Sequence, residues 1–182
     1  MKAGASAKRM EMQGRWCDSR GFTLMELTIA VVLIGLFSVI SLPLLTAGEE
    51  RDLQYAARRL SATVKYLFNE AALSGKEHRL ICDLDGNSYR ARLLEPDGQL
   101  KDVEGLAKGA VLKGGIDVLR LKLEGQGSFN RGEVTLHIDP SGWMEHAIVV
   151  LENTRGQMLS LDFNPFTGTA EVFEGERSFE AY

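Results

Sequence analysis

The sequence has few of the residues that fix a fold covalently or interrupt its elements. Its 182 residues include two cysteines, Cys17 and Cys82, so a framework of several disulfides is excluded. Four prolines and nineteen glycines exclude collagen-like and low-complexity chains. Hydrophobic residues make up 45% and charged residues 25%, which excludes a largely disordered chain and a polytopic membrane protein. The length suits one domain with an appended segment.

An excess of positive charge is also missing, because the formal net charge is −4 at pH 7. Nucleic acid is therefore not an expected partner. The motifs GxSxG, HExxH, CxxC and the Walker loop do not occur in the sequence. We therefore expect a protein that is not an enzyme, with no catalytic residues, no cofactor and no metal.

Three weaker candidates for chemistry favour structural interpretations. The segment Asp83–Asn87 has the glycine of a calcium loop at its fourth position, and a hairpin turn fits it better. His137 and His146 could face each other across a hairpin, but no third ligand is evident, which favours an exposed, unliganded pair. Cys82 follows Ile81 in an apolar segment and is expected to be a small strand residue.

The most uneven feature is a long run with almost no charge. Residues 1–21 hold five basic and two acidic side chains, whereas residues 22–47 hold the single charge of Glu26. A helix of that length spans about 39 Å, more than the ~30 Å of bilayer hydrocarbon. We predict a transmembrane helix over 22–47, with a cytoplasmic N-terminus because the preceding segment is basic. Residues 48–182 are then expected outside the cytoplasm.

A cleaved secretory signal is the competing interpretation of this run. Such a signal has a shorter apolar core followed by a small-residue cleavage site. The junction between Ala47 and Gly48 could serve as that site, so this alternative stays open.

The boundary between the basic segment and the apolar run has a distinctive sequence, Arg20-Gly21-Phe22-Thr23-Leu24-Met25-Glu26-Leu27. It resembles the prepilin leader of type IV pilins and type II secretion pseudopilins. The resemblance implies that a prepilin peptidase removes residues 1–21 by cutting between Gly21 and Phe22. It further implies that Phe22 becomes N-methylated and that Glu26, at the fifth mature position, acts in assembly.

Two further positions match that family, Gly35 at the fourteenth mature position and Pro43 at the twenty-second. Pro43 is expected to kink the helix because proline lacks a backbone donor. The leader of 21 residues is longer than many in the family. Met10 or Met12 could therefore be the true start in place of Met1.

The physics of Glu26 agrees with an assembly role. A carboxylate inside a hydrocarbon-spanning helix is costly unless it finds a partner. After removal of the leader, the new amine of Phe22 on the same or a neighbouring copy would supply one. The alternative is a carboxylate that snorkels to the membrane edge.

An amphipathic helix is predicted over 49–74, beyond the membrane. Apolar residues recur there at steps of three and four, namely Leu53, Ala57, Leu60, Val64, Leu67 and Ala71. Gly75 is expected to end the helix. The apolar stripe is expected to pack on the sheet of the same domain.

Antiparallel strands are predicted over 78–173. A hairpin joins 78–84 to 88–94 through the turn 85–87, and 96–115 is expected to be a loop with one short strand near Val111. The remaining strands are expected at 116–123, 133–138, 146–151, 158–163 and 169–173, the last three forming a meander. The expected fold is α+β, with a long N-terminal helix on antiparallel sheet.

The order of the C-terminal strands resembles that of the GspH/FimT pseudopilins. The similarity rests on Asp139-Pro140-Ser141-Gly142, the strands that follow, and Pro165-Phe166-Thr167-Gly168. It implies a pilin-like fold and a minor pseudopilin of a type II secretion system, anchored in the bacterial inner membrane with a periplasmic domain. The implied partners are other pseudopilins of a periplasmic filament, the prepilin peptidase, the inner-membrane assembly platform and membrane lipid. The alternative is a FimT-like minor pilin of a type IV pilus, serving pilus assembly or DNA uptake.

Overall fold

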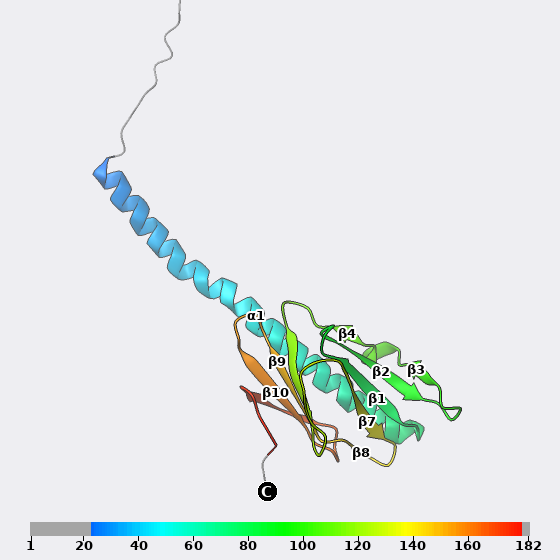
Figure 1. Cartoon of the computed structure of the whole chain (residues 1–182). Coiled ribbons are helices and arrows are strands. Elements are labelled where there is room, and N and C mark those ends of the chain that lie inside the picture. Colours follow the sequence, from blue (N-terminus) through cyan, green and yellow to red (C-terminus); the bar gives the residue numbers. More distant parts are fainter. Residues whose placement is uncertain (1–22, 180–182) are drawn as a thin grey trace, which may run out of the picture. The chain divides into compact units, whose positions relative to one another are not determined.

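The structure, a computed structural model, describes residues 23–179, apart from the side chains of residues 39–47 and 106. The chain divides into two units, one up to Ser41 and one from Leu42 onward. The described residues form one long helix, a short 3-10 helix and a series of strands in two sheets (Figure 1). The predicted α+β class with antiparallel sheets is confirmed.

The helix α1 spans Leu24–Ser74, and the 3-10 helix η1 spans Gly105–Ala107. The strands are β1 (His78–Asp83), β2 (Ser88–Leu94), β3 (Leu100–Asp102), β4 (Ala110–Val111), β5 (Asp117–Leu123), β6 (Gly127–Phe129), β7 (Glu133–Asp139), β8 (Trp143–Met144), β9 (Ala147–Glu152), β10 (Met158–Phe163) and β11 (Ala170–Glu174).

The second half of α1 packs on the sheets through the predicted stripe. The six stripe residues are all buried, Leu53, Ala57, Leu60, Val64, Leu67 and Ala71. Ala56, Thr63 and Phe68 are buried beside them, so the packed face is wider than the stripe. The helix ends as predicted at Gly75, whose φ of 67° suits glycine and whose N–H donates to Ala71 O at 3.0 Å.

The six-stranded sheet has the order β3-β2-β1-β7-β8, with β4 paired to β2. The predicted hairpin is confirmed, because His78 pairs with Leu93 and Asp83 with Ser88. On β1 and β7, Leu80 faces the same side as its partner Leu136, and both belong to the core. Every second residue of β7 is buried, namely Val134, Leu136 and Ile138.

The five-stranded sheet has the order β11-β10-β9-β5-β6, so the predicted C-terminal meander is confirmed. The regular alternation of β5 is interrupted by a bulge between Val118 and Arg120. The extra residue shifts the register, so that Val118 and Leu121 both reach the core. The bulge could not be read from a pattern of period two.

The short strands differ most from the prediction. The strand near Val111 is confirmed as β4, while the loop around it also contains β3 and η1. The strands β6 and β8 were not predicted. Each has two or three residues, too few to show a period.

Loops fasten α1 to the sheets at two levels. Near the start of the domain, Glu49 Oε2 accepts a bond from Thr154 Oγ1 at 2.9 Å and pairs with Arg155 Nε at 3.0 Å. Further along, Gly168 has a φ of 63°, and an added Cβ there would lie 2.5 Å from the ring of Phe68. Glycine at this position thus permits the turn after β10 to approach the helix closely.

Candidate functional site

The N-terminal end of α1 carries a reciprocal capping arrangement that the sequence interpretation missed. Thr23 precedes the helix, and its Oγ1 accepts the Glu26 N–H at 3.1 Å. Glu26 Oε2 accepts from Thr23 N–H and from Thr23 Oγ1, both at 3.3 Å. Thr-x-x-Glu is the capping-box pattern, so the spacing itself could have revealed it. Glu26 therefore stabilises the helix start of its own chain.

The other residues predicted for processing lie elsewhere. Gly21 and Phe22 are outside the described residues, so cleavage and methylation stay predictions. Pro43 falls within α1, but its side chain is also outside the description, and the predicted kink stays a prediction. Gly35 lies in α1 with nothing within 4 Å of where a Cβ would be.

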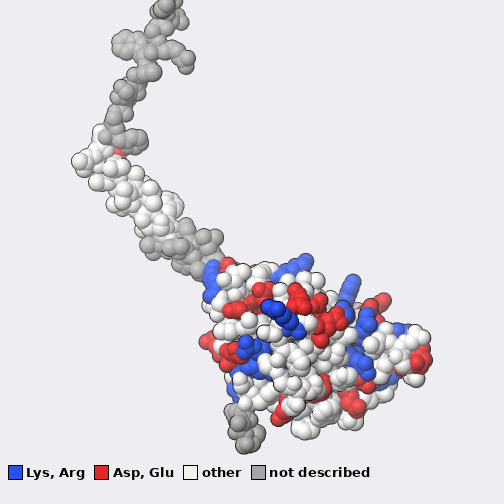
Figure 2. All heavy atoms as spheres, viewed as in Figure 1, with Lys and Arg blue, Asp and Glu red and all other residues white. Residues whose placement is uncertain are grey.

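The helix surface between residues 24 and 37 is apolar on every side apart from Glu26 and Thr28, which lie near its N-terminal end. Its large side chains are 48–81% exposed, namely Leu24, Met25, Leu27, Ile29, Val31, Val32, Leu33, Ile34, Leu36 and Phe37. Figure 2 shows this part of the chain almost free of charge, while the globular part carries both signs interspersed. A helix that is hydrophobic all round needs an apolar environment, and a patch of this extent marks an interaction surface.

Within the part of the chain that the structure describes, no helix is long and apolar enough to cross a membrane. The predicted span over 22–47 includes residues outside that part and stays a prediction.

The two histidines do not face each other as the sequence allowed. Backbone bonds place Glu145 opposite His137, because Glu145 N–H donates to His137 O at 3.3 Å. His146 is one residue further on, and a shift of one residue turns a side chain to the opposite face. His137 Nδ1 instead lies 3.0 Å from Glu77 Oε1.

Glu77 is held mainly by its two basic neighbours. Partial burial acts to raise its pKa, but hydrogen bonds with His137 and Arg79 outweigh burial and lower the pKa of Glu77 below its usual value. Arg79 Nε lies 2.7 Å from Glu77 Oε1. The arrangement is a partly exposed ion pair that links the start of β1 to His137 of β7.

The remaining candidates for chemistry have structural roles. Cys82 is buried in β1, and burial raises the pKa of its thiol to about 12, so the thiol is unreactive at neutral pH. The segment Asp83–Asn87 forms the predicted turn, in which Gly86 N–H donates to Asp83 Oδ1 at 2.9 Å. Over residues 23–179, no group of three or more His, Cys, Asp or Glu side chains is arranged to hold a metal ion.

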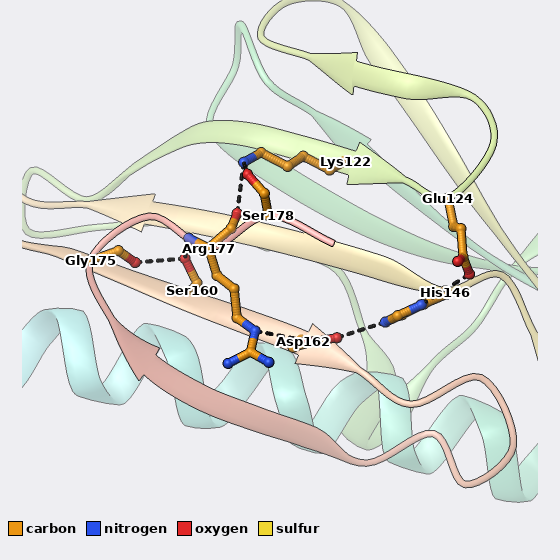
Figure 3. A network of polar contacts seen from close by, with 8 residues as sticks. All are labelled: Lys122, Glu124, His146, Ser160, Asp162, Gly175, Arg177 and Ser178. Atoms are coloured by element: carbon orange, nitrogen blue, oxygen red, sulfur yellow. Dashed lines mark hydrogen bonds and ion pairs between the residues drawn. The ribbon is translucent and has the colours of Figure 1, made fainter. Parts of the chain in front are cut away.

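A polar network lies on the side of the five-stranded sheet away from α1. Figure 3 shows Lys122 of β5, Ser160 and Asp162 of β10, and His146 before β9 meeting residues that follow β11. His146 Nε2 lies 2.8 Å from Asp162 Oδ1, and its Nδ1 lies 3.1 Å from Glu124 Oε2. Sequence reasoning did not single out these contacts, because they depend on strand register.

Comparisons with known proteins add two findings. The family described as "Prokaryotic N-terminal methylation motif" matches residues 16–42. Two solved structures of the minor pseudopilin EpsH from the type II secretion system of Vibrio cholerae are similar in fold. One is 16% identical with a TM-score of 0.53, covering 68% of this chain and 97% of that chain. The other is 19% identical with a TM-score of 0.57, covering 70% and 98%.

Comparison with curated proteins finds no match. The structural likeness covers nearly all of each EpsH chain, and the expected pilin-like architecture is confirmed. The motif match covers the segment that contains Gly21, Phe22 and Glu26. The chain therefore carries the prokaryotic N-terminal methylation motif on a pilin-like fold that it shares with EpsH.

Proposed function

We propose that this chain is a minor pseudopilin of a type II secretion system, a structural subunit of the periplasmic pseudopilus that drives export of folded proteins. The observation that carries the proposal is the helix surface of residues 24–37, whose only charge is Glu26 and which lies within the methylation motif at 16–42. The fold shared with EpsH supports the same function. Such a surface is buried either in a membrane or against apolar helices of neighbouring subunits.

Processing precedes assembly in this proposal. The prepilin peptidase cuts between Gly21 and Phe22, and Phe22 is then methylated. Before extraction, residues 22–47 anchor the chain in the bacterial inner membrane with the N-terminus cytoplasmic and residues 48–182 in the periplasm. The partners are the other pseudopilins, the inner-membrane assembly platform and membrane lipid. The work of the protein is assembly, without catalysis.

Glu26 has two roles in this proposal. Its Oε2 caps the helix of its own chain through Thr23, and its second oxygen can accept a bond from the Phe22 amine of a neighbouring copy. Attraction between opposite charges is strong in an apolar filament core, so this contact would select one axial register.

The alternative is a FimT-like minor pilin of a type IV pilus. The same fold and leader are compatible with it. Removal of five basic and two acidic leader residues makes the chain more acidic than its whole-sequence charge of −4, and DNA binding requires clustered Lys and Arg. The acidic balance favours the secretion function, and nucleic acid is not an expected partner.

Two substitutions of Glu26 test the proposal. Glutamine can replace glutamate in a capping box, so Glu26→Gln keeps the cap and removes the charge, whereas Glu26→Leu removes both. We expect both variants to insert in the membrane and to be cut after Gly21. Both should lose crosslinking to neighbouring pseudopilins by at least tenfold and should impair secretion.

Comparing the two variants separates the effect of the Glu26 charge from the effect of the helix cap. If Glu26→Gln assembles normally while Glu26→Leu does not, the residue acts through the cap and the register role is wrong. Normal crosslinking and secretion in both variants would contradict an assembly role of Glu26 altogether.

A further inference from the structure

The five-stranded sheet has an outer face, opposite the core, with two aligned rows of side chains. One row is Arg120, Val150 and Ser160, and the next is Lys122, Ile148 and Asp162. Val149, between the two β9 residues, belongs to the core, so Ile148 and Val150 point to the other side of the strand. Both are nevertheless 0% exposed. Residues outside the α1-facing core must therefore cover them.

The segment 175–179, here called the strap, turns back over this face of the sheet after β11 (Figure 3). At its start, Ser160 Oγ donates to Gly175 O at 2.6 Å and accepts the Arg177 N–H at 2.9 Å. One serine hydroxyl thus satisfies two backbone groups of the strap. These bonds fix the direction of the strap across β10.

A buried lysine binds the middle of the strap. Lys122 Nζ donates to Arg177 O at 2.6 Å and to Ser178 Oγ at 3.0 Å, and it lies 2.8 Å from Glu176 Oε1. Arg120 Nη1 reaches the same Glu176 oxygen at 2.6 Å. The hydrogen bond with Lys122 lowers the pKa of Glu176 below its usual value. Two cations of β5 therefore recognise one glutamate of the strap.

The end of the strap packs on His146. The ring of Phe179 meets the imidazole edge to face, with 4.7 Å between ring centroids. Asp162 connects this end to the middle, because its Oδ1 lies 2.8 Å from His146 Nε2 and its Oδ2 lies 3.3 Å from Arg177 Nε. The strap is thus held in succession by hydrogen bonds with Ser160, by the cations Arg120 and Lys122, and by an aromatic contact.

The strap therefore lies on the outer face of the sheet as a bound peptide would, although it belongs to the same chain. We propose that the outer face of the five-stranded sheet is a binding site for an extended peptide with a glutamate and, three residues later, an aromatic side chain, and that the strap of a second copy of this chain can occupy it. An identical segment makes identical contacts, which is why exchange between copies is a low-cost route to association. The proposal does not depend on the function proposed for α1.

Gly175 provides the hinge that such an exchange needs. Its φ of 81° lies in the region that favours glycine, and nothing lies within 4 Å of where its Cβ would be. The strap can therefore change direction at this residue, while the Gly175 N–H, which donates to Met158 O at 2.9 Å, keeps the end of β11 on β10. Binding between copies should be weak for two reasons. The strap is short, and the strap attached to each chain competes at high effective concentration.

The test uses the full chain in detergent and a fluorescent peptide with the sequence of residues 174–179. Glu176→Lys loosens the strap by placing a third cation beside Arg120 and Lys122, and Phe179→Ala loosens it by removing the ring. We expect the peptide to bind both variants at least tenfold more tightly than the unmodified chain, whose own strap competes. Adding Lys122→Met to Phe179→Ala should abolish that gain.

Glu174→Lys is the matched control, because it makes the same charge change on the exposed end of β11, outside the strap. It should bind the peptide no better than the unmodified chain. A peptide that itself carries Glu176→Lys should bind none of the proteins. If Phe179→Ala keeps its native circular dichroism and melting transition yet gains no peptide binding, the proposal is wrong. The same conclusion follows if the peptide binds equally well with Lys122→Met.

Discussion

The two parts of α1 are both helical, but their apolar side chains are exposed in the first part and buried in the second. Between residues 24 and 37 apolar side chains occur on every side and are exposed, as Leu33 is at 48%. Between residues 49 and 74 they form a face that is buried, as Leu67 is at 0%. The second part finds its apolar partner within its own domain, and the first must find it in lipid or in other subunits. The sequence period thus separates the surface on which the domain folds from the surface that we propose for assembly, here called the assembly surface.

The largest expected effect comes from removing the assembly surface. A chain that begins at Glu49 should be a soluble monomer with a cooperative melting transition, because the buried face of α1 still covers the sheets. Size-exclusion chromatography and thermal melting would test this expectation. Aggregation without a cooperative transition would show that the two surfaces cannot be separated.

Two leucine-to-alanine substitutions sharpen the comparison within the full chain. Leu67→Ala should destabilise the domain by about 2–5 kcal/mol, because it leaves a cavity in the core. Leu33→Ala should change domain stability by less than about 0.5 kcal/mol. Chemical denaturation measured by domain fluorescence would give both values. Similar losses from both substitutions would contradict the division of the helix.

The smallest expected effect concerns the acid sensitivity of the strap. The hydrogen bond with Lys122 lowers the pKa of Glu176 from its ordinary 4.5, so the carboxylate contributes stability above about pH 4.5. That contribution is lost as the pH falls through the lowered pKa, and for a surface ion pair it is below about 1 kcal/mol.

Hydrogen exchange of residues 176–179, corrected for intrinsic rates, would measure this effect. Protection in the unmodified chain should fall on acidification, while Glu176→Gln should start lower and change less. Equal pH dependence in the two chains would assign the acid sensitivity to other carboxylates, since the pKa values of Glu77 and Glu95 are lowered as well.

The features that the sequence predicted well are those that follow a hydrophobic period or a local turn pattern. The stripe from Leu53 to Ala71, the hairpin of β1 and β2, and the C-terminal meander are of this kind. The capping box of Thr23 and Glu26 was equally readable from its spacing, although it was not recognised.

What the sequence could not predict depends on register and on long-range contact. The bulge after Val118, the pairing of His137 with Glu145 and the placement of the strap on Lys122 are of this second kind. No local pattern of residues 175–179 indicates that they turn back over the outer face of the five-stranded sheet. Such contacts are decided by which strands become neighbours.

The central claim is that the apolar helix surface stays on the chain after prepilin processing and serves assembly. Identifying the mature N-terminal residue tests this claim most directly. Mass spectrometry of the protein extracted from membranes should show a chain that begins at N-methylated Phe22. The apolar surface and Glu26 would then remain attached to the domain, as assembly requires. A chain that begins at Gly48, after cleavage behind Ala47, would lack that surface and would contradict the account.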